Sequence, residues 1–149
     1  MQEAGLLEEF RPSKEKNSIP YVLMVEDDLT MELLWRHIIS EVNEQAVVKW
    51  VTTVEAAEQL IRRRIQAERP FDLVVSDVFL PSHRTGIDLW RHYGNGSTPF
   101  ILTSVLAPQK LLKMIGNNEP LPPYVQKPLA MDDCIETVRS LLEPEEVLA

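Results

Sequence analysis

Carboxylates close two apolar runs of this chain. The run 21–25 is followed by Glu26 and Asp27, and the run 71–76 is followed by Asp77. Short apolar runs that end in polar residues are typical of parallel strands buried on both faces, whose carboxyl ends meet at one edge of a sheet. Like charges about 4 Å apart repel by about 4 kcal/mol at an effective dielectric of 20. A bound divalent cation would offset this repulsion between the carboxylates.

The chemistry of the cluster favours magnesium. Mg²⁺ takes oxygen ligands, accepts one or two carboxylates and completes its octahedron with water and phosphate oxygens, and Mn²⁺ is an alternative. Two more apolar runs end in groups that suit phosphoryl transfer, because Thr103 and Ser104 close one run and Lys127 closes another. A carboxylate can be the nucleophile, a hydroxyl can donate to a phosphoryl oxygen, and an ammonium supplies a point charge.

Five strand patterns alternate with five helix patterns. The expected strands are 21–25, 46–51, 71–77, 100–103 and 124–127. Helices are expected over 30–42, 86–93, 108–115 and 130–142. A further helix is expected between the first two, beginning at a capping box formed by Thr52 and Glu55 and ending at Pro70. The alternation predicts an α/β fold in which helices cover both faces of a parallel sheet.

Two of these helices carry predicted apolar stripes. In the first helix the stripe is Leu33, Leu34, Ile38 and Val42. In the second it is Val54, Ala57, Ile61 and Ile65. Both stripes have the spacing of one helical face turned toward a core.

Composition limits the classes of function. The chain has 149 residues, enough for one domain, and its net charge of −8 disfavours binding to nucleic acid. Its single cysteine, Cys134, cannot form an internal disulfide, and no apolar stretch has the roughly 20 residues of a membrane span. We expect a cytoplasmic protein without membrane contact, with a flexible N-terminal extension at 1–18, a domain at 19–143 and a C-terminal tail at 144–149.

Four motifs in this order resemble the receiver domains of two-component response regulators. The motifs are VMVEDD, SDVFLP, ILTS and YVQKP, and the resemblance spans about 19–142. Each motif alone is a weak signal, whereas the set at these distances is specific. The resemblance implies a flavodoxin-like, doubly wound (βα)5 fold whose five-stranded parallel sheet has the strand order 2-1-3-4-5.

The resemblance also implies roles for the residues around the proposed cation. Asp77 matches the phospho-acceptor, and Asp27 matches a direct magnesium ligand. Glu26 would act on the metal directly or through water, and the backbone carbonyl of Phe79 would be a further ligand. Asp28 is extra by this alignment, and a solvated helix start is the better interpretation for it.

The resemblance implies a switch as well. Lys127 matches the phosphate-binding lysine, Thr103 the switch hydroxyl and Tyr124 the switch aromatic. An aspartyl phosphate would attract Thr103 and let Tyr124 turn inward. The chain would catalyse its own phosphorylation and slow dephosphorylation, and it would not be a conventional multi-turnover enzyme.

The implied partners are proteins. The phosphoryl donor would be a phosphohistidine of a sensor histidine kinase or a histidine phosphotransfer protein. A downstream protein would bind the region 107–142, and a homodimer is left open. Because nothing after Leu142 is long enough to fold, we expect a stand-alone receiver that signals through a protein contact.

Two features depart from the family pattern. Four residues, 82–85, lie between Pro81 and Gly86 where the family usually has three, so the loop beside the acceptor is reshaped. The two positions that steer the hydrolytic water in the family hold Phe79 and Val105. Both side chains are apolar, which predicts a slow loss of the phosphoryl group.

Two other functions remain open at this point. The first is a receiver-like scaffold that binds a partner independently of phosphorylation, against which the full set of site residues argues. The second is a magnesium-dependent phosphohydrolase. Such enzymes need a second aspartate two residues after the nucleophile, where this chain has Phe79.

Overall fold

The strands form one parallel sheet in a computed structural model that describes residues 18–94, 96, 98–116 and 120–144. The sheet order is β2-β1-β3-β4-β5, which confirms the predicted fold class. The predicted N-terminal extension and C-terminal tail lie outside the described residues except for positions 18 and 144. The strands are β1 (Tyr21–Val25), β2 (Val47–Val51), β3 (Leu73–Asp77), β4 (Phe100–Ser104) and β5 (Tyr124–Gln126).

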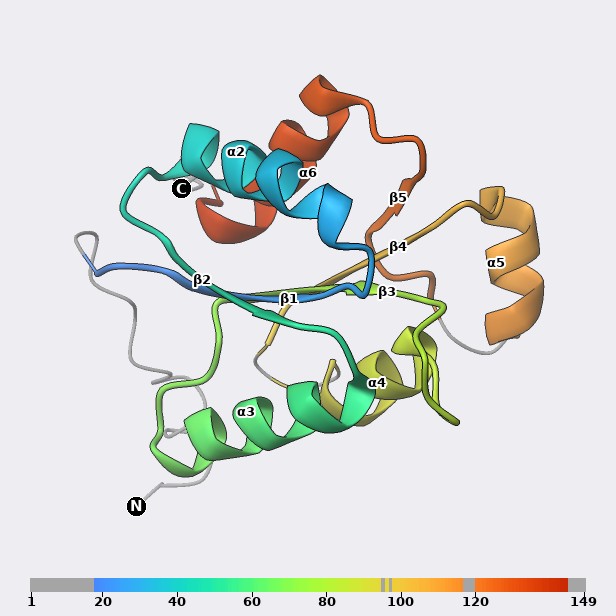
Figure 1. The fold of residues 1–149 in the computed structure, drawn as a ribbon, viewed down its shortest axis with the longest axis horizontal. Coiled ribbons are helices and arrows are strands. Elements are labelled where there is room, and N and C mark those ends of the chain that lie inside the picture. The colour runs from blue at the N-terminus through green and yellow to red at the C-terminus, as the bar shows by residue number, and fades with distance from the viewer. Residues whose placement is uncertain (1–17, 95, 97, 117–119, 145–149) are drawn as a thin grey trace, which may run out of the picture.

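Helices cover both faces of the sheet (Figure 1). On one face α2 and α6 pack side by side, while α3, α4 and α5 contribute to the core on the other face. The helices are α2 (Glu32–Val42), α3 (Val54–Gln66), α4 (Gly86–Tyr93), α5 (Pro108–Ile115) and α6 (Met131–Leu142), and a short 3-10 turn, η1 (Leu29–Met31), precedes α2.

Burial follows the position of each strand in the sheet. Every residue of the central strands β3 and β4 is buried, as expected for strands covered on both faces. The edge strand β2 is half-buried along most of its length. The apolar runs that predicted strands are therefore clearest where the sheet is doubly covered.

The predicted stripe of α2 is partly wrong. Trp35, Ile38, Ile39 and Val42 are the buried residues of this helix, whereas the side chain of Leu33 is 83% exposed. At 3.6 residues per turn, a residue two positions before Trp35 lies about 200° around the helix from it. Leu33 therefore faces away from the sheet.

The second helix also differs in detail from its prediction. Val54, Ala57 and Ile61 are buried as expected, but Ile65 is exposed near the helix end. The N-cap is Thr53 and not Thr52, because the Thr53 hydroxyl accepts a hydrogen bond from the backbone N–H of Ala56. The shift by one residue leaves the helix register unchanged.

The strand register brings the predicted site residues to one edge. Val25 at the end of β1 pairs with Ser76, and Asp77 at the end of β3 pairs with Thr103. The chain order reverses between β1 and β3, and ligands of open α/β sheets bind in the crevice outside such a point. This edge lies toward the right of Figure 1, where the chain leaves β1 and β3.

Candidate functional site

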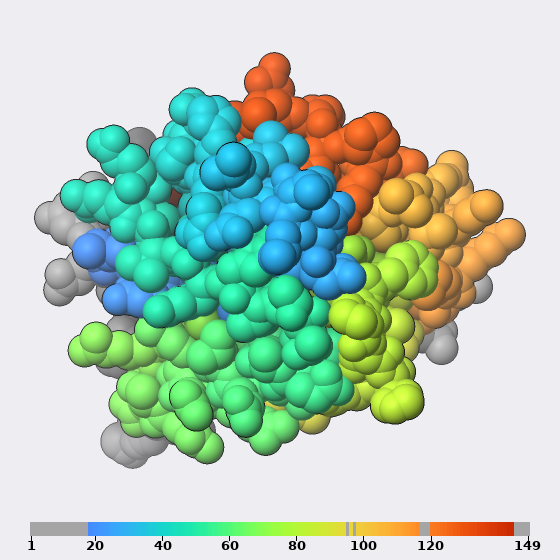
Figure 2. Space-filling view, viewed as in Figure 1, coloured from blue at the N-terminus to red at the C-terminus, as the bar shows by residue number. Residues whose placement is uncertain are grey.

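Three carboxylates meet at the carboxyl edge of the sheet. Glu26 and Asp27 follow β1 directly, and Asp77 ends the neighbouring strand β3. Each offers an oxygen that lies within 4.8 Å of the other two. Glu26 and Asp77 are buried, and Asp27 is exposed. The space-filling view places the segments that follow β1 and β3 next to each other on the surface (Figure 2).

Lys127 directly follows β5, and its side chain extends to this cluster. Its Nζ lies 2.9 Å from Oε1 of Glu26 and 3.1 Å from Oδ2 of Asp77. Its backbone N–H donates to the carbonyl of Ser104 at 2.8 Å, which ties the end of β5 to the end of β4. One ammonium therefore bridges carboxylates that belong to two other strands.

Burial and charge shape the ionisation of this group. Burial raises the pKa of Glu26 even though the hydrogen bond from Lys127 opposes the shift. Burial would lower the pKa of Lys127, but its hydrogen bond to Glu26 and the negative charge of Asp77 outweigh that effect and raise it. Lys127 is therefore a stable cation at neutral pH, and it offsets part of the repulsion in the cluster.

The donor set of the cluster fits a small hard cation. Three carboxylate oxygens converge, which suits Mg²⁺ or Mn²⁺ better than a metal that prefers sulfur or nitrogen. The second oxygen of Glu26, Oε2, accepts the backbone N–H of Asp28 at 3.0 Å. With Lys127 on Oε1, both oxygens of Glu26 have hydrogen-bond donors, which fits either a direct or a water-mediated role.

The hydroxyl residues of β4 divide between two environments. Thr103 is buried beside Asp77 as its register partner. The hydroxyl of Ser104 lies 2.7 Å from that of Tyr124, which donates to the carbonyl of Leu106 at 2.5 Å. Tyr124 is thus half-buried and joined to the β4–α5 loop.

The loop after β3 folds back over Asp77. The backbone N–H of Phe79 donates to Oδ1 of Asp77 at 3.3 Å, and that of Gly86 donates to the carbonyl of Val78 at 2.9 Å. A Cβ on Gly86 would lie 2.1 Å from the carbonyl oxygen of Asp77. Glycine is therefore required for this close approach of α4 to the end of β3.

Asp28 has the structural role that the sequence favoured for it. Its Oδ1 accepts the backbone N–H of Thr30 at 3.0 Å and the hydroxyl of Thr30 at 2.6 Å. These two hydrogen bonds lower the pKa of Asp28. Asp28 thus caps η1 and stands outside the carboxylate cluster.

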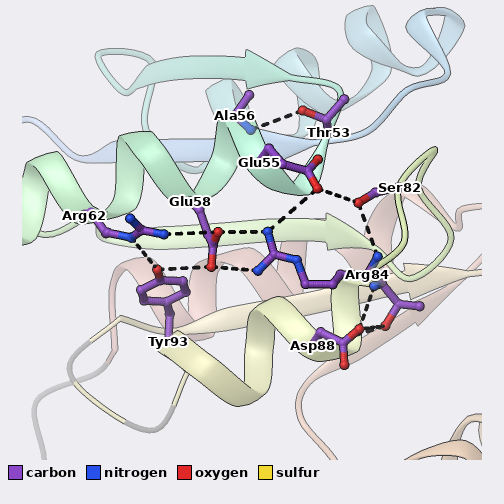
Figure 3. A network of polar contacts seen from close by, with 10 residues as sticks. Thr53, Glu55, Ala56, Glu58, Arg62, Ser82, Arg84, Asp88 and Tyr93 are labelled. Atoms are coloured by element: carbon purple, nitrogen blue, oxygen red, sulfur yellow. Dashed lines mark hydrogen bonds and ion pairs between the residues drawn. The ribbon is translucent and has the colours of Figure 1, made fainter.

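The sequence did not predict one polar network near the site. Glu58 of α3 holds Arg84 of the loop after β3, and Arg62 and Tyr93 contact the same carboxylate (Figure 3). The spacing of Glu58 and Arg62 is an ordinary helical pair that could have been found. The partnership with Arg84 spans 26 residues, and nothing local in the sequence indicates it.

Comparison with solved structures establishes the fold. The chain is 22% identical to the signal receiver domain of an HD domain-containing protein from Pseudomonas fluorescens Pf-5, covering 89% of this chain and 93% of that one at a TM-score of 0.67. It is 23% identical to the non-phosphorylated HemR receiver domain from Leptospira biflexa, covering 87% and 99% at a TM-score of 0.63. A CheY-like receiver domain protein from Methanospirillum hungatei JF-1 is 20% identical, covering 85% and 95% at a TM-score of 0.62.

The fold of response regulator receiver domains is therefore shared at low sequence identity. No family model matches the sequence, and no curated protein is detectably similar to it. Within the described ranges, no helix has the length and apolar character to cross a membrane.

Proposed function

We propose that this chain is a response regulator receiver that accepts a phosphoryl group on Asp77. The observation that carries the proposal is the meeting of Glu26, Asp27 and Asp77 with the ammonium of Lys127, from three different strands, at one edge of a receiver-type fold. Carboxylates that only cap a helix or keep the protein soluble would not need to converge with an ammonium group in this way. Phosphoryl transfer depends on positioning and electrostatics of this kind.

The proposed reaction uses the carboxylate of Asp77 as nucleophile. One carboxylate oxygen forms a bond to phosphorus while the bond from phosphorus to the imidazole nitrogen of a phosphohistidine breaks. The imidazole leaves with the electron pair and is protonated from solvent. Lys127, whose Nζ lies 3.1 Å from Oδ2 of Asp77, would interact with the transferred group, and buried Thr103 would donate a hydrogen bond to a phosphoryl oxygen.

Glu26, Asp27 and Asp77 would hold a magnesium ion, with the backbone carbonyl of Phe79 as a further ligand. When bound, such an ion neutralises negative charge on the phosphoryl oxygens. The protein residues keep the site in order, because Lys127 and the backbone N–H of Asp28 fix the two oxygens of Glu26.

The proposed output is a contact with another protein. The donor is a histidine kinase or a histidine phosphotransfer protein in the cytoplasm, and the target would bind the surface of α5, β5 and α6 within 107–142. Tyr124 joins β5 to the β4–α5 loop through Ser104 and Leu106, so movement of Thr103 toward a phosphoryl group would reach this surface through the adjacent Ser104. A dimer of the phosphorylated chain would use the same surface.

The decisive experiment is incubation with magnesium and acetyl phosphate, followed by intact mass measurement. We expect the stable addition of one phosphoryl group, and its loss in Asp77→Asn. Asp132→Asn, which alters an exposed carboxylate at the start of α6, is the matched control and should be modified as the wild type is. Absence of an adduct in the wild type would favour a phosphorylation-independent scaffold, and rapid turnover of the donor would favour a phosphohydrolase.

A further inference from the structure

The loop between β3 and α4 is held at both ends. At its start, the backbone N–H of Val78 donates to the carbonyl of Thr103 at 2.8 Å. At its end, Thr85 and Asp88 form a capping box that fixes the first turn of α4. The intervening residues include Phe79, the proposed main-chain ligand.

Next to the capping box, a forked ion pair between Arg84 and Glu58 attaches the end of this loop to α3. Arg84 Nη1 lies 2.9 Å from Oε2 of Glu58, and Arg84 Nη2 lies 2.9 Å from Oε1. The side chain of Glu58 is only 11% exposed. A guanidinium that binds a carboxylate through two parallel hydrogen bonds fixes both distance and orientation, which a single contact does not.

The carboxylate of Glu58 is in turn held from its own helix and from α4. Arg62 Nη2 lies 3.2 Å from Oε1, and the hydroxyl of Tyr93 lies 3.4 Å from Oε2. The Nε of Arg62 also donates to the Tyr93 hydroxyl at 3.1 Å. Glu58 is therefore presented to Arg84 in one orientation.

A second contact fixes the loop one turn of α3 earlier. The hydroxyl of Ser82 donates to Oε2 of Glu55 at 2.9 Å and accepts the backbone N–H of Arg84 at 3.2 Å. Arg84 and Ser82 thus reach two carboxylates on one face of α3 (Figure 3). We call Glu55, Glu58, Ser82 and Arg84 the loop clamp.

The loop clamp can affect the candidate site because the other end of the same loop contacts Asp77. The backbone N–H of Phe79 contacts Oδ1 of Asp77, so the loop conformation and the acceptor carboxylate are coupled directly. Functional groups must be held within about 0.5 Å of the productive geometry by supporting contacts. An exposed ion pair contributes little to stability, whereas a forked pair on a nearly buried carboxylate can supply this geometric support.

We propose that Arg84 and Glu58 are positioning residues for phosphoryl acceptance, which hold the loop so that the main chain at Phe79 stays in place beside Asp77 and its cation. This inference rests on the proposed function of Asp77. Neither residue is assigned a contact with the phosphoryl group.

The test compares Arg84→Gln, Arg84→Lys and Glu58→Gln in the full chain with the wild type. Two quantities are measured for each variant: the dissociation constant of Mg²⁺ by calorimetry, and the rate of Asp77 phosphorylation by acetyl phosphate as a function of Mg²⁺ concentration. Loss of a supporting partner typically weakens metal binding by about 10-fold. We expect a rise of about this size for Arg84→Gln and Glu58→Gln, with the rate largely restored at saturating Mg²⁺. Arg84→Lys should not rescue, because lysine cannot form the fork.

A matched control separates positioning from stability. Arg36→Gln breaks the 2.8 Å pair with Glu32 on α2, which lies on the other face of the sheet, and should leave Mg²⁺ affinity unchanged. Amide hydrogen exchange at Phe79 should accelerate in the Arg84 variants and not in this control. The double variant Glu58→Arg, Arg84→Glu, which exchanges the two charges, should recover part of the lost Mg²⁺ affinity.

The outcomes distinguish the two proposals. If the wild type binds Mg²⁺ and is phosphorylated, but the clamp variants keep wild-type Mg²⁺ affinity while losing thermal stability, the positioning role is wrong and the clamp is structural only. If the wild type itself neither binds Mg²⁺ nor forms an adduct, the proposed function fails and the positioning role fails with it.

Discussion

Nζ of Lys127 lies 2.9 Å from Oε1 of Glu26, although 101 residues separate them in the chain. Glu26 is almost completely buried, and the same ammonium is 3.1 Å from Oδ2 of Asp77. Lys127 therefore compensates for two buried carboxylates at once. This relationship makes the stability of the site and its proposed chemistry depend on one side chain.

Substitution of Lys127 by Met should impair both properties. Removing one partner of a buried ion pair leaves uncompensated charge and costs about 3–5 kcal/mol, which urea unfolding at pH 7 in EDTA would measure. Loss of a charged group aimed at a transition state lowers rates by about 10²–10³, so phosphorylation of Asp77 should slow by this factor. Lys113→Met, an exposed lysine of α5, is the control. Phosphorylation of Lys127→Met at the wild-type rate would contradict the role given to Lys127.

Glu26→Gln should remove a pH dependence of stability and weaken metal binding. Burial raises the pKa of Glu26 above its usual value of 4.5, so the fold favours the protonated form. The wild type should then lose stability in EDTA as the pH rises from about 4.5 through the folded pKa of Glu26. Glutamine removes this dependence, so the unfolding temperature of the variant relative to that of the wild type should rise across this pH window.

The same variant tests the metal site. With one carboxylate fewer, Mg²⁺ should bind about 10-fold more weakly and stabilise the protein less at a given concentration. Thermal unfolding with and without Mg²⁺ measures both effects. An unchanged Mg²⁺ response would show that Glu26 does not belong to the site.

The aspartyl phosphate should be long-lived. Phe79 and Val105 occupy the positions that would orient a hydrolytic water, and their side chains are 48% and 66% exposed and apolar. Placing Asn at 79 and Glu at 105 should shorten the lifetime by about 10-fold or more, since general base assistance contributes typically 10²–10⁴-fold. The decay of the mass adduct measures it. Equal lifetimes for both proteins would contradict the assignment.

Gly86→Ala should be strongly destabilising. Its Cβ would lie 2.1 Å from the carbonyl oxygen of Asp77 and 2.8 Å from Oγ of Ser76, in a region that backbone hydrogen bonds hold in place. Forced overpacking costs about 1–3 kcal/mol. Gly96→Ala is the matched control, because nothing lies within 4 Å of a Cβ there, and it should stay within about 0.5 kcal/mol of the wild type. Chemical denaturation compares the two.

Cys134 should resist alkylation in the folded protein. Burial raises the pKa of its thiol to about 11, so almost no thiolate forms at pH 8. The side chain is also fully buried in the core between α6 and the sheet. Iodoacetamide should therefore react with Cys134 only after unfolding in urea. Rapid labelling of the native protein would contradict this.

Local patterns accounted for most elements and misjudged their finer details. Helix periodicity located α2, but the orientation of Leu33 depends on which side of the helix meets the sheet. Two adjacent threonines precede α3, and backbone geometry selected Thr53 as the cap. Such choices between neighbours are made by packing and by φ and ψ, which residue types do not specify.

The order of apolar runs and polar ends along the chain is enough to predict a doubly wound sheet and to select Glu26, Asp27, Asp77, Thr103 and Lys127 as candidate residues. This is possible because burial on both faces and the meeting of strand ends follow from local composition. The loop clamp was decided only by tertiary structure. No local signal links Arg84 to Glu58, and their pairing arises because α3 and the loop after β3 pack together once the sheet has formed.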